Sequence, residues 1–275
     1  MKTYHFLAGL PRSGNTLLSS ILNQNPDIYS SPLSPMNGML WDYDQGLMTN
    51  ENFLRLNDVQ PILNAGKNII INYYANVSKP IILDREKAWA TEGNFNLIKK
   101  YITPTPKVIF TVRPIIEILT SFMTVLPEDS YVDKAMQNSG WWYKNYLTKN
   151  DNRCDFLMSP GGQIDKSLFS INQIINSDNK NMFHIVSYDE IVNKPEDALK
   201  GIYKFLKLPS YKHNLDNIVK LEKDNNEIVG LPTNLHEIRL KLSKVSKKPE
   251  DVLSEYAINK YSNVGWDKAN YKPKM

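Results

Sequence analysis

The sequence predicts an α/β fold: a P-loop-like three-layer sandwich with a mainly parallel central sheet flanked by helices. Short apolar runs typical of strands alternate with helical patterns, and a glycine-bearing loop joins the first strand to the first helix. The runs lack a strict polar alternation, as expected for strands covered on both faces. A length of 275 residues is near the upper size for one hydrophobic core, so we predict a single domain over residues 1–275.

The predicted elements alternate along the chain. Strands are predicted for YHFLA (4–8), PIILD (80–84), VIFTV (108–112) and MFHIV (182–186). Helices are predicted for TLLSSILNQ after the first strand, PIIEILTSFMTV after VIFTV, PEDALKGIYKFLKL (195–208) and PEDVLSEYAINKY (249–261). Pro114 suits a first helical position. Residues 27–66 and 127–178 lack a strong pattern, and we expect these insertions to shape an acceptor cleft above the strand ends.

Composition and charge limit the classes of partner. The chain is 41% hydrophobic and 23% charged, and its formal net charge of +4 is too small to argue for nucleic acid or an anionic membrane. Cys154 is the only cysteine, so an internal disulfide and a cysteine-based metal site are excluded. The first residues do not resemble a signal peptide, and no apolar stretch is long enough to span a bilayer. We therefore expect a cytoplasmic protein.

The loop GLPRSGN after the first strand predicts an anion-binding site. Gly9 and Gly14 have the spacing of the nucleotide loop G-x-x-x-x-G-K-[ST], and Thr16 occupies its hydroxyl position. Backbone N–H groups at the start of a helix favour a bound anion. Asn15 replaces the lysine that would reach the β- and γ-phosphates, so we expect an anion other than a metal-bound triphosphate. Arg12 adds a cation that can contact two oxygens at once.

A second anion site is predicted within VIFTVRPIIEILTSF. Arg113 follows a strand, and Ser121 lies eight residues later on the next helix, just over two turns away. Together these side chains could hold a second phosphate. Alternatively, Arg113 pairs with Glu117 and Ser121 is a hydroxyl on the helix surface.

In combination, these segments resemble the sulfotransferase family that uses 3′-phosphoadenosine 5′-phosphosulfate (PAPS). GLPRSGNTLLSSILNQNP resembles the 5′-phosphosulfate loop of its bacterial and tyrosylprotein branches, and VRPIIEILTS resembles its 3′-phosphate motif. SYDEIVNKPEDALKGIYKFLKLP is similar to the family's Y-E-x-L…P…L-x-x-I-x-x-F-L segment. The resemblance spans residues 4 to about 210 and implies in-line sulfuryl transfer to a hydroxyl or amine acceptor. It also implies that no metal is needed and that the product is 3′-phosphoadenosine 5′-phosphate (PAP).

The resemblance implies roles for individual residues. The residues implied at the 5′-phosphosulfate are Arg12, Ser13, Gly14, Asn15 and Thr16. The residues implied at the 3′-phosphate are Arg113 and Ser121, with Tyr188 near the adenine end. LSKVS (242–246) resembles a late segment that closes the donor site in the tyrosylprotein branch, which makes Ser243 and Lys244 candidate phosphate contacts.

Catalytic cations are implied at a third segment. LDREKAW resembles a D-K-x-R-x-W-like pattern of the family, so Arg85 and Lys87 join Arg12 as candidate catalytic residues. The alternative for Arg85 and Lys87 is a solvated run of charges.

The general base and the acceptor are left open. The tyrosylprotein branch places a glutamate six residues after an Asn-Pro or His-Pro pair, and that position is Pro32 here. Replacement candidates, each of which could equally be an ordinary surface or packing residue, are Asp42, Asp44, Asp84 and His236. The acceptor could be a small molecule, a carbohydrate or a peptide, and the oligomeric state is undetermined. The alternative functions are a P-loop small-molecule kinase, with Asp84 as its one Mg²⁺ candidate, and a non-catalytic module that binds PAP or PAPS.

Overall fold

The computed structural model describes residues 2–141, 143–220, 238–244 and 247–265. At the centre of this part of the chain is a five-stranded sheet in which all pairs are parallel, in the order β2-β3-β1-β4-β5. The strands are β1 (Thr3–Gly9), β2 (Ile28–Ser30), β3 (Ile81–Arg85), β4 (Val108–Val112) and β5 (Phe183–Ser187). The predicted α/β class with a parallel sheet is confirmed, and β2 is an additional strand inside a region without a sequence pattern.

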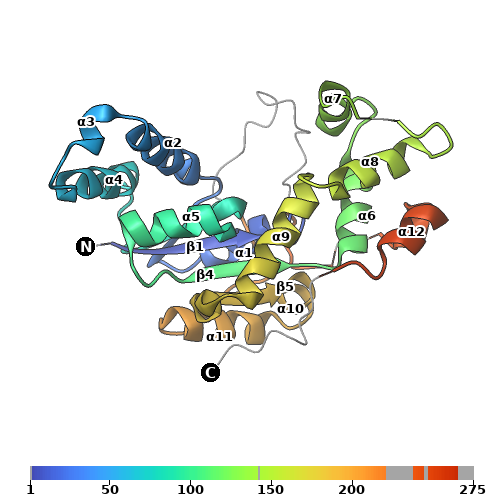
Figure 1. Ribbon diagram of the computed structural model, residues 1–275. Coiled ribbons are helices and arrows are strands. Elements are labelled where there is room, and N and C mark those ends of the chain that lie inside the picture. The colour runs from blue at the N-terminus through green and yellow to red at the C-terminus, as the bar shows by residue number, and fades with distance from the viewer. Residues whose placement is uncertain (1, 142, 221–237, 245–246, 266–275) are drawn as a thin grey trace.

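Helices cover both faces of the sheet, which makes the three layers seen in Figure 1. Phe6 of β1 packs in one apolar cluster with side chains of α5, α6 and α9, whereas its neighbour Leu7 packs in a second cluster with α1, α10 and α11. Successive strand residues point to opposite faces, so this alternation builds a core on each side. The bounds of these helices are α1 (Asn15–Leu22), α5 (Glu92–Leu97), α6 (Ile115–Val125), α9 (Gln163–Asn176), α10 (Tyr188–Asn193) and α11 (Pro195–Leu206).

Two helix predictions need correction. Pro114 is the residue before α6, with an extended ψ of 135°, and the first helical residue is Ile115. The segment 249–261 is not one helix but a 3₁₀ turn, η5 (Pro249–Asp251), followed by α12 (Glu255–Tyr261). The break arises because the Ser254 hydroxyl accepts a hydrogen bond from the backbone N–H of Ala257 and so starts a new helix.

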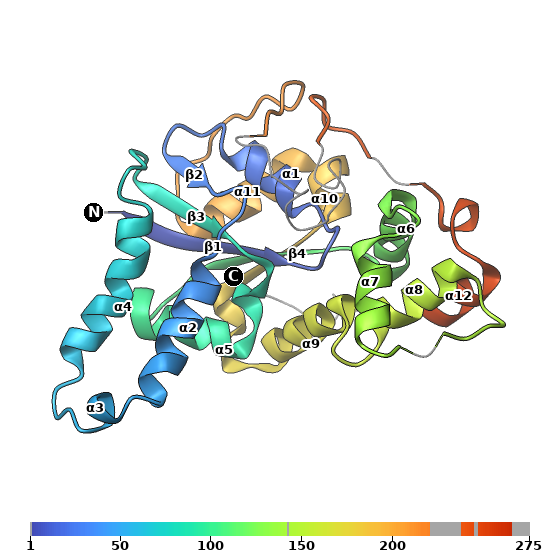
Figure 2. The same ribbon diagram turned by 90° about the horizontal axis from the view of Figure 1, so that it is seen from above.

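The two regions without a sequence pattern are mostly helical. Residues 27–66 contain β2 and lead into α2 (Met36–Met48), α3 (Glu51–Leu54) and α4 (Gln60–Tyr73), which Figure 2 shows projecting from the sheet. Residues 127–178 form α7 (Tyr131–Asn138), α8 (Lys149–Met158) and α9. Both α7 and α8 begin with a capping box, Ser130–Asp133 and Thr148–Asp151, a sequence signal for a helix start.

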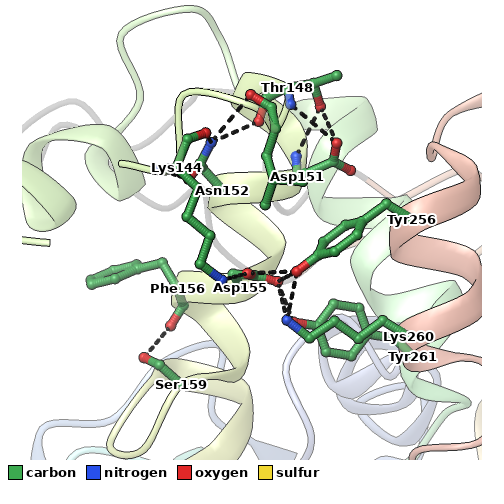
Figure 3. A network of polar contacts seen from close by, with 11 residues as sticks. Lys144, Thr148, Asp151, Asn152, Asp155, Phe156, Ser159, Tyr256, Lys260 and Tyr261 are labelled. Carbon is green, nitrogen blue, oxygen red and sulfur yellow. Dashed lines mark hydrogen bonds and ion pairs between the residues drawn. The ribbon is translucent and has the colours of Figure 1, made fainter. Parts of the chain in front are cut away.

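The last described helix, α12, is fastened to α8 by the carboxylate of Asp155 (Figure 3). This buried carboxylate accepts hydrogen bonds from Lys144 Nζ at 2.6 Å, Lys260 Nζ at 2.8 Å and the hydroxyl of Tyr261 at 2.6 Å. The hydroxyl of Tyr256 is a further donor, at 2.9 Å. Burial alone would raise the pKa of Asp155, but these donors lower it to about 2.

The sheet topology predicts a ligand site at the carboxyl ends of β1 and β4. These strands are neighbours, yet α1 after β1 and α6 after β4 pack in the two different apolar clusters, on opposite faces. In a parallel sheet, such a change of side opens a crevice where ligands bind. The loops leaving β1 and β4 at this edge carry Arg12 and Arg113. No helix among the described residues is long and apolar enough to cross a membrane.

Candidate donor site

The loop between β1 and α1 is packed tightly against β4 and α10. A Cβ on Gly9 would lie 2.2 Å from Thr111 Oγ1 and 2.6 Å from the Thr111 carbonyl oxygen, so a side chain cannot be accommodated there. Gly14, which precedes α1, has a φ of 90°, and a Cβ on it would lie 2.9 Å from the Tyr188 ring. The two glycines therefore allow the loop to pass close to the neighbouring backbone and ring.

Two side chains of the loop hold its shape. Ser13 is fully buried, with its hydroxyl 2.5 Å from the Leu10 carbonyl oxygen and 2.5 Å from Thr111 Oγ1. The Asn15 amide donates to the same Leu10 carbonyl at 3.3 Å and accepts from Thr111 Oγ1 at 2.9 Å. The residue in place of the P-loop lysine thus bonds within the loop. An anion at this loop would mainly contact the backbone N–H groups in the first turn of α1, because these groups have no partner within the helix.

Arg85, at the end of β3, reaches across to this loop. Its Nη1 donates to the Thr16 hydroxyl at 3.1 Å, and its Nε donates to the Ser31 carbonyl oxygen at 3.3 Å. The Ser31 hydroxyl in turn accepts from the backbone N–H of Arg85 at 2.7 Å. Arg85 is therefore held beside the anion loop by a buried serine that sequence reasoning missed. Lys87 is exposed, in the 3₁₀ turn η1 (Lys87–Ala90) that follows.

Arg113 directly follows β4 and contacts the loop between β1 and α1. It is 4% exposed, and its Nη1 donates to the Arg12 carbonyl oxygen at 3.0 Å. Its Nε donates to the Glu117 carboxylate at 3.0 Å, so the pairing considered as an alternative from sequence is present. Its guanidinium also lies 4.4 Å from the centre of the Tyr188 ring. The structure thus brings together Arg113 and Tyr188, which are 75 positions apart in the sequence.

Arg12 belongs to the first predicted anion site and contacts a residue of the second. Its backbone has a left-handed φ of 59°, and its Nε donates to the Ser121 hydroxyl at 3.1 Å. Burial lowers the pKa of Arg12, and the positive charge of Arg113 lowers it further. Tyr131, at the start of α7, opposes this effect and raises the pKa of Arg12. In the sequence, Tyr131 is marked only by the capping box of Ser130 and Asp133, which predicts the start of a helix but no functional role for Tyr131.

Lys244 comes much later in the chain and pairs with a residue of α10. Its Nζ is 2.7 Å from the Asp189 carboxylate on α10. That hydrogen bond raises the pKa of Lys244, as does the charge of Glu117, whereas the charge of Arg113 lowers it. The segment is anchored by a hydrogen bond from the Leu242 N–H to the Leu215 carbonyl oxygen, 2.8 Å long. Ser243 is exposed on this segment.

Asp84 is a core residue. It is fully buried and accepts three hydrogen bonds of 2.5 to 2.7 Å, from Ser34 Oγ, the Tyr74 hydroxyl and Trp89 Nε1. Burial raises the pKa of this carboxyl group, against the effect of the three donors. A carboxylate engaged in this way ties β3, α4 and η1 together and has little capacity left for a metal ion or an acceptor proton.

The other candidate bases lie in different settings. Asp44 accepts from Lys100 Nζ and the Tyr101 hydroxyl, both at 2.6 Å, which fastens α2 to the body of the fold. Asp42 is exposed on α2. His236 lies outside the described residues.

Comparison with known proteins decides the family. The model of the Sulfotransferase family matches residues 5–213 of the chain. The chain belongs to this family. The match covers β1 from His5 onward, the other four strands of the sheet, and Arg12, Arg85 and Arg113, whereas Lys244 lies beyond it.

The fold is similar to that of a solved sulfotransferase domain. The sulfotransferase domain from the curacin biosynthetic pathway is 15% identical, with a TM-score of 0.51 over 100% of this chain and 95% of that one. The sulfotransferase from Alicyclobacillus acidocaldarius is 12% identical, with a TM-score of 0.49 over 83% and 90% of the two chains. The mouse sulfotransferase SULT7A1 complexed with PAP is 16% identical, with a TM-score of 0.44 over 77% and 61%. A comparison with curated protein sequences gave no match.

Proposed function

We propose that this sulfotransferase takes the sulfuryl group from PAPS and transfers it in line to a hydroxyl or amine acceptor, releasing PAP. The observation that carries the proposal is the contact of Arg85 with Thr16, which sets a buried cation beside an anion loop whose lysine is replaced by Asn15. A donor with a single phosphosulfate needs charge compensation at the loop but no group for a γ-phosphate.

The chemistry asked of the site is stabilisation of negative charge on the bridging oxygen that leaves the sulfur. Backbone N–H groups around Gly14 and the guanidinium of Arg85 are fixed before the reaction, so they provide this stabilisation without reorganising. Lys87 is a second candidate cation. In the same proposal the donor's 3′-phosphate contacts Arg113 and Ser121, and its adenine lies toward Tyr188.

The acceptor would enter from the side of the two helical insertions, 27–66 and 127–178. Small-molecule, carbohydrate and peptide hydroxyl groups are all compatible with the proposed transfer. Asp42 and His236 are the bases that remain from sequence, because Asp44 and Asp84 are engaged in the fold.

The contacts of Asp84 disfavour the rival kinase function. A P-loop kinase needs an acidic residue to hold Mg²⁺, and Asp84, the candidate from sequence, is fully buried under three donors. A non-catalytic PAP-binding module would keep the donor site and show no transfer, so an activity assay separates it from an enzyme.

The test is release of PAP from PAPS with a panel of phenols, sugars, amines and tyrosine peptides. We expect release that depends on the acceptor and persists with a metal chelator. Arg85→Ala should lower turnover by about a hundredfold or more, the scale for loss of one preorganised charge-stabilising group. Arg55→Ala, on the exposed end of α3, is the matched control and should leave turnover unchanged. Binding of PAP without transfer to any acceptor would support the non-catalytic module instead.

A further inference from the structure

The segment between β2 and α2, residues 31–35, is fixed to the end of β3 at two points. The Ser31 hydroxyl accepts a hydrogen bond from the backbone N–H of Arg85 at 2.7 Å, and the Ser31 carbonyl oxygen accepts from Arg85 Nε at 3.3 Å. Three residues later, the Ser34 hydroxyl donates to the buried carboxylate of Asp84 at 2.7 Å. Two prolines in the segment restrict its backbone further. The course of this segment is therefore set by the fold.

Leu33 lies between these two anchors and faces solvent. Its neighbours Pro32 and Ser34 are buried, whereas Leu33 is 61% exposed. Two residues of chain span at most about 7 Å, so the Cα of Leu33 lies within that distance of the Cα of Ser31. Because Ser31 bonds Arg85, an exposed apolar side chain is held close to the cation proposed for the sulfuryl end.

The exposed residues around Leu33 carry no side chain that can form a hydrogen bond. The exposed positions among residues 31–39 are Leu33, Pro35, Gly38 and Met39. We call these four residues the apolar edge. Both serines of the stretch are buried, with their hydroxyls bonded to the end of β3, and Asn37 is half-buried. A sugar is recognised by hydrogen bonds to its hydroxyl groups and would find few partners here, whereas an alkyl or aryl group would gain by leaving water.

We propose that the apolar edge contacts the acceptor, so that the group sulfated is a hydroxyl on an apolar skeleton, an alkyl or aryl alcohol, rather than a hydroxyl of a sugar. This inference rests on the proposed sulfuryl transfer. The acceptor oxygen must approach the sulfur in line, beside the cation that bonds Ser31. Carbon atoms of an acceptor in this position cover Leu33, and their binding strengthens with the apolar area removed from water.

The test varies the apolar part of the acceptor while the reacting hydroxyl stays the same. Release of PAP from PAPS gives kcat/KM for phenols with a para-methyl, ethyl, propyl or butyl group. The same assay compares cyclohexanol with inositol, a ring of the same size that carries a hydroxyl on every carbon atom. We expect kcat/KM to rise about two- to fourfold for each added CH2 group, the scale for partial to full burial of a methylene. Cyclohexanol should be a better acceptor than inositol.

Variants at two exposed leucines locate the contact. Leu33→Asn should remove most of the rise across the phenol series, and Leu33→Met should keep it. Leu54→Asn is the matched control, because Leu54 is 66% exposed on α3, and it should leave the rise unchanged. Calorimetry should give the same dissociation constant for PAP in the wild type and all three variants, which shows that each variant is folded with an intact donor site.

The outcomes separate this inference from the proposed function. If inositol is as good an acceptor as cyclohexanol and kcat/KM does not rise along the phenol series, the transfer stands and the inference on the acceptor is wrong. A full rise retained in Leu33→Asn also contradicts the inference, because the apolar contact then lies elsewhere. If the protein binds PAP but transfers sulfate to no acceptor, the proposed transfer fails and the inference fails with it.

Discussion

Arg85 donates a hydrogen bond to the hydroxyl of Thr16, 3.1 Å away, although 69 positions separate the two residues in the chain. The contact joins the end of β3 to the first turn of α1 and places a guanidinium beside the loop that the sequence predicts to bind an anion. A charge fixed before the reaction begins is what transfer of a charged group requires of a protein.

Ser31→Ala tests how Arg85 is held. The Ser31 hydroxyl accepts from the Arg85 backbone N–H at 2.7 Å, so its removal frees the end of β3 without touching the guanidinium. We expect turnover to fall about tenfold with little change in the KM for the donor, as for a group that positions a catalytic side chain. Steady-state kinetics check this, with Ser210→Ala, an exposed serine, as the control. A rise in KM at constant turnover would assign Ser31 to donor binding instead.

Asn15→Ala tests the loop itself. Both polar atoms of the Asn15 amide are bonded, to Leu10 and Thr111, so the variant should lose about 1–3 kcal/mol of unfolding free energy. Urea denaturation measures this loss, with exposed Asn64→Ala as the comparison. Asn15→Lys should lose a similar amount without gaining affinity for ATP with Mg²⁺. Tight ATP binding by Asn15→Lys would mean that the loop is a kinase loop lacking one residue.

Lys244→Ala tests the late basic segment. Lys244 is half exposed and paired with Asp189, and the charge of Arg113 acts on it, so we expect PAP binding to weaken about three- to tenfold, less at high salt. Lys241→Ala removes a cation from the same segment that pairs with Asp216 instead, and should leave PAP binding unchanged. Equal effects of the two variants would show general attraction by the segment and remove Lys244 from the site.

Asp155→Asn tests the attachment of α12. The pKa of Asp155 is lowered from 3.8 to about 2 in the fold, so its stabilising effect is fully present above about pH 4 and is lost as pH falls toward 2. Breaking such a buried cluster costs about 3–5 kcal/mol, and the variant should melt earlier at pH 7, with a smaller difference from the wild type near pH 2. Thermal unfolding from pH 2 to 7 measures this, with exposed Asp42→Asn as control. A constant difference at all pH values would contradict the linkage.

The parts of the fold that sequence predicted are those controlled by local pattern. The strands β1, β3, β4 and β5 are apolar runs buried on both faces, and the anion loop carries its glycine spacing in consecutive residues. β2 has three residues, Ile28–Ser30, which is too short for a periodicity to register. The α2–α4 arm was missed because α2 and α4 bury few of their residues, so their apolar positions form no clear stripe.

The sequence singled out individual candidate site residues, but it did not predict the contacts between them. Arg12, Arg85 and Arg113 stand at the ends of predicted strands, a position that signals ligand binding in parallel sheets. Their partners are set by tertiary structure: Ser31 meets Arg85 through the pairing of β2 with β3, and Ser121 meets Arg12 because α6 follows the neighbouring strand. Asp84 was misleading, since an acid after a strand can equally be a buried hydrogen-bond acceptor.

The central claim is that the donor site takes a 3′-phosphoadenosine nucleotide without a metal. The most direct measurement is the thermal stabilisation of the wild-type protein by PAP with chelator, compared with ATP and Mg²⁺. A ligand at a hundred times its dissociation constant adds about 2.7 kcal/mol, which a melting curve resolves. We predict a clear shift with PAP that is the same with and without chelator. A shift with ATP and Mg²⁺ alone would contradict the account and point to a nucleotide-triphosphate site.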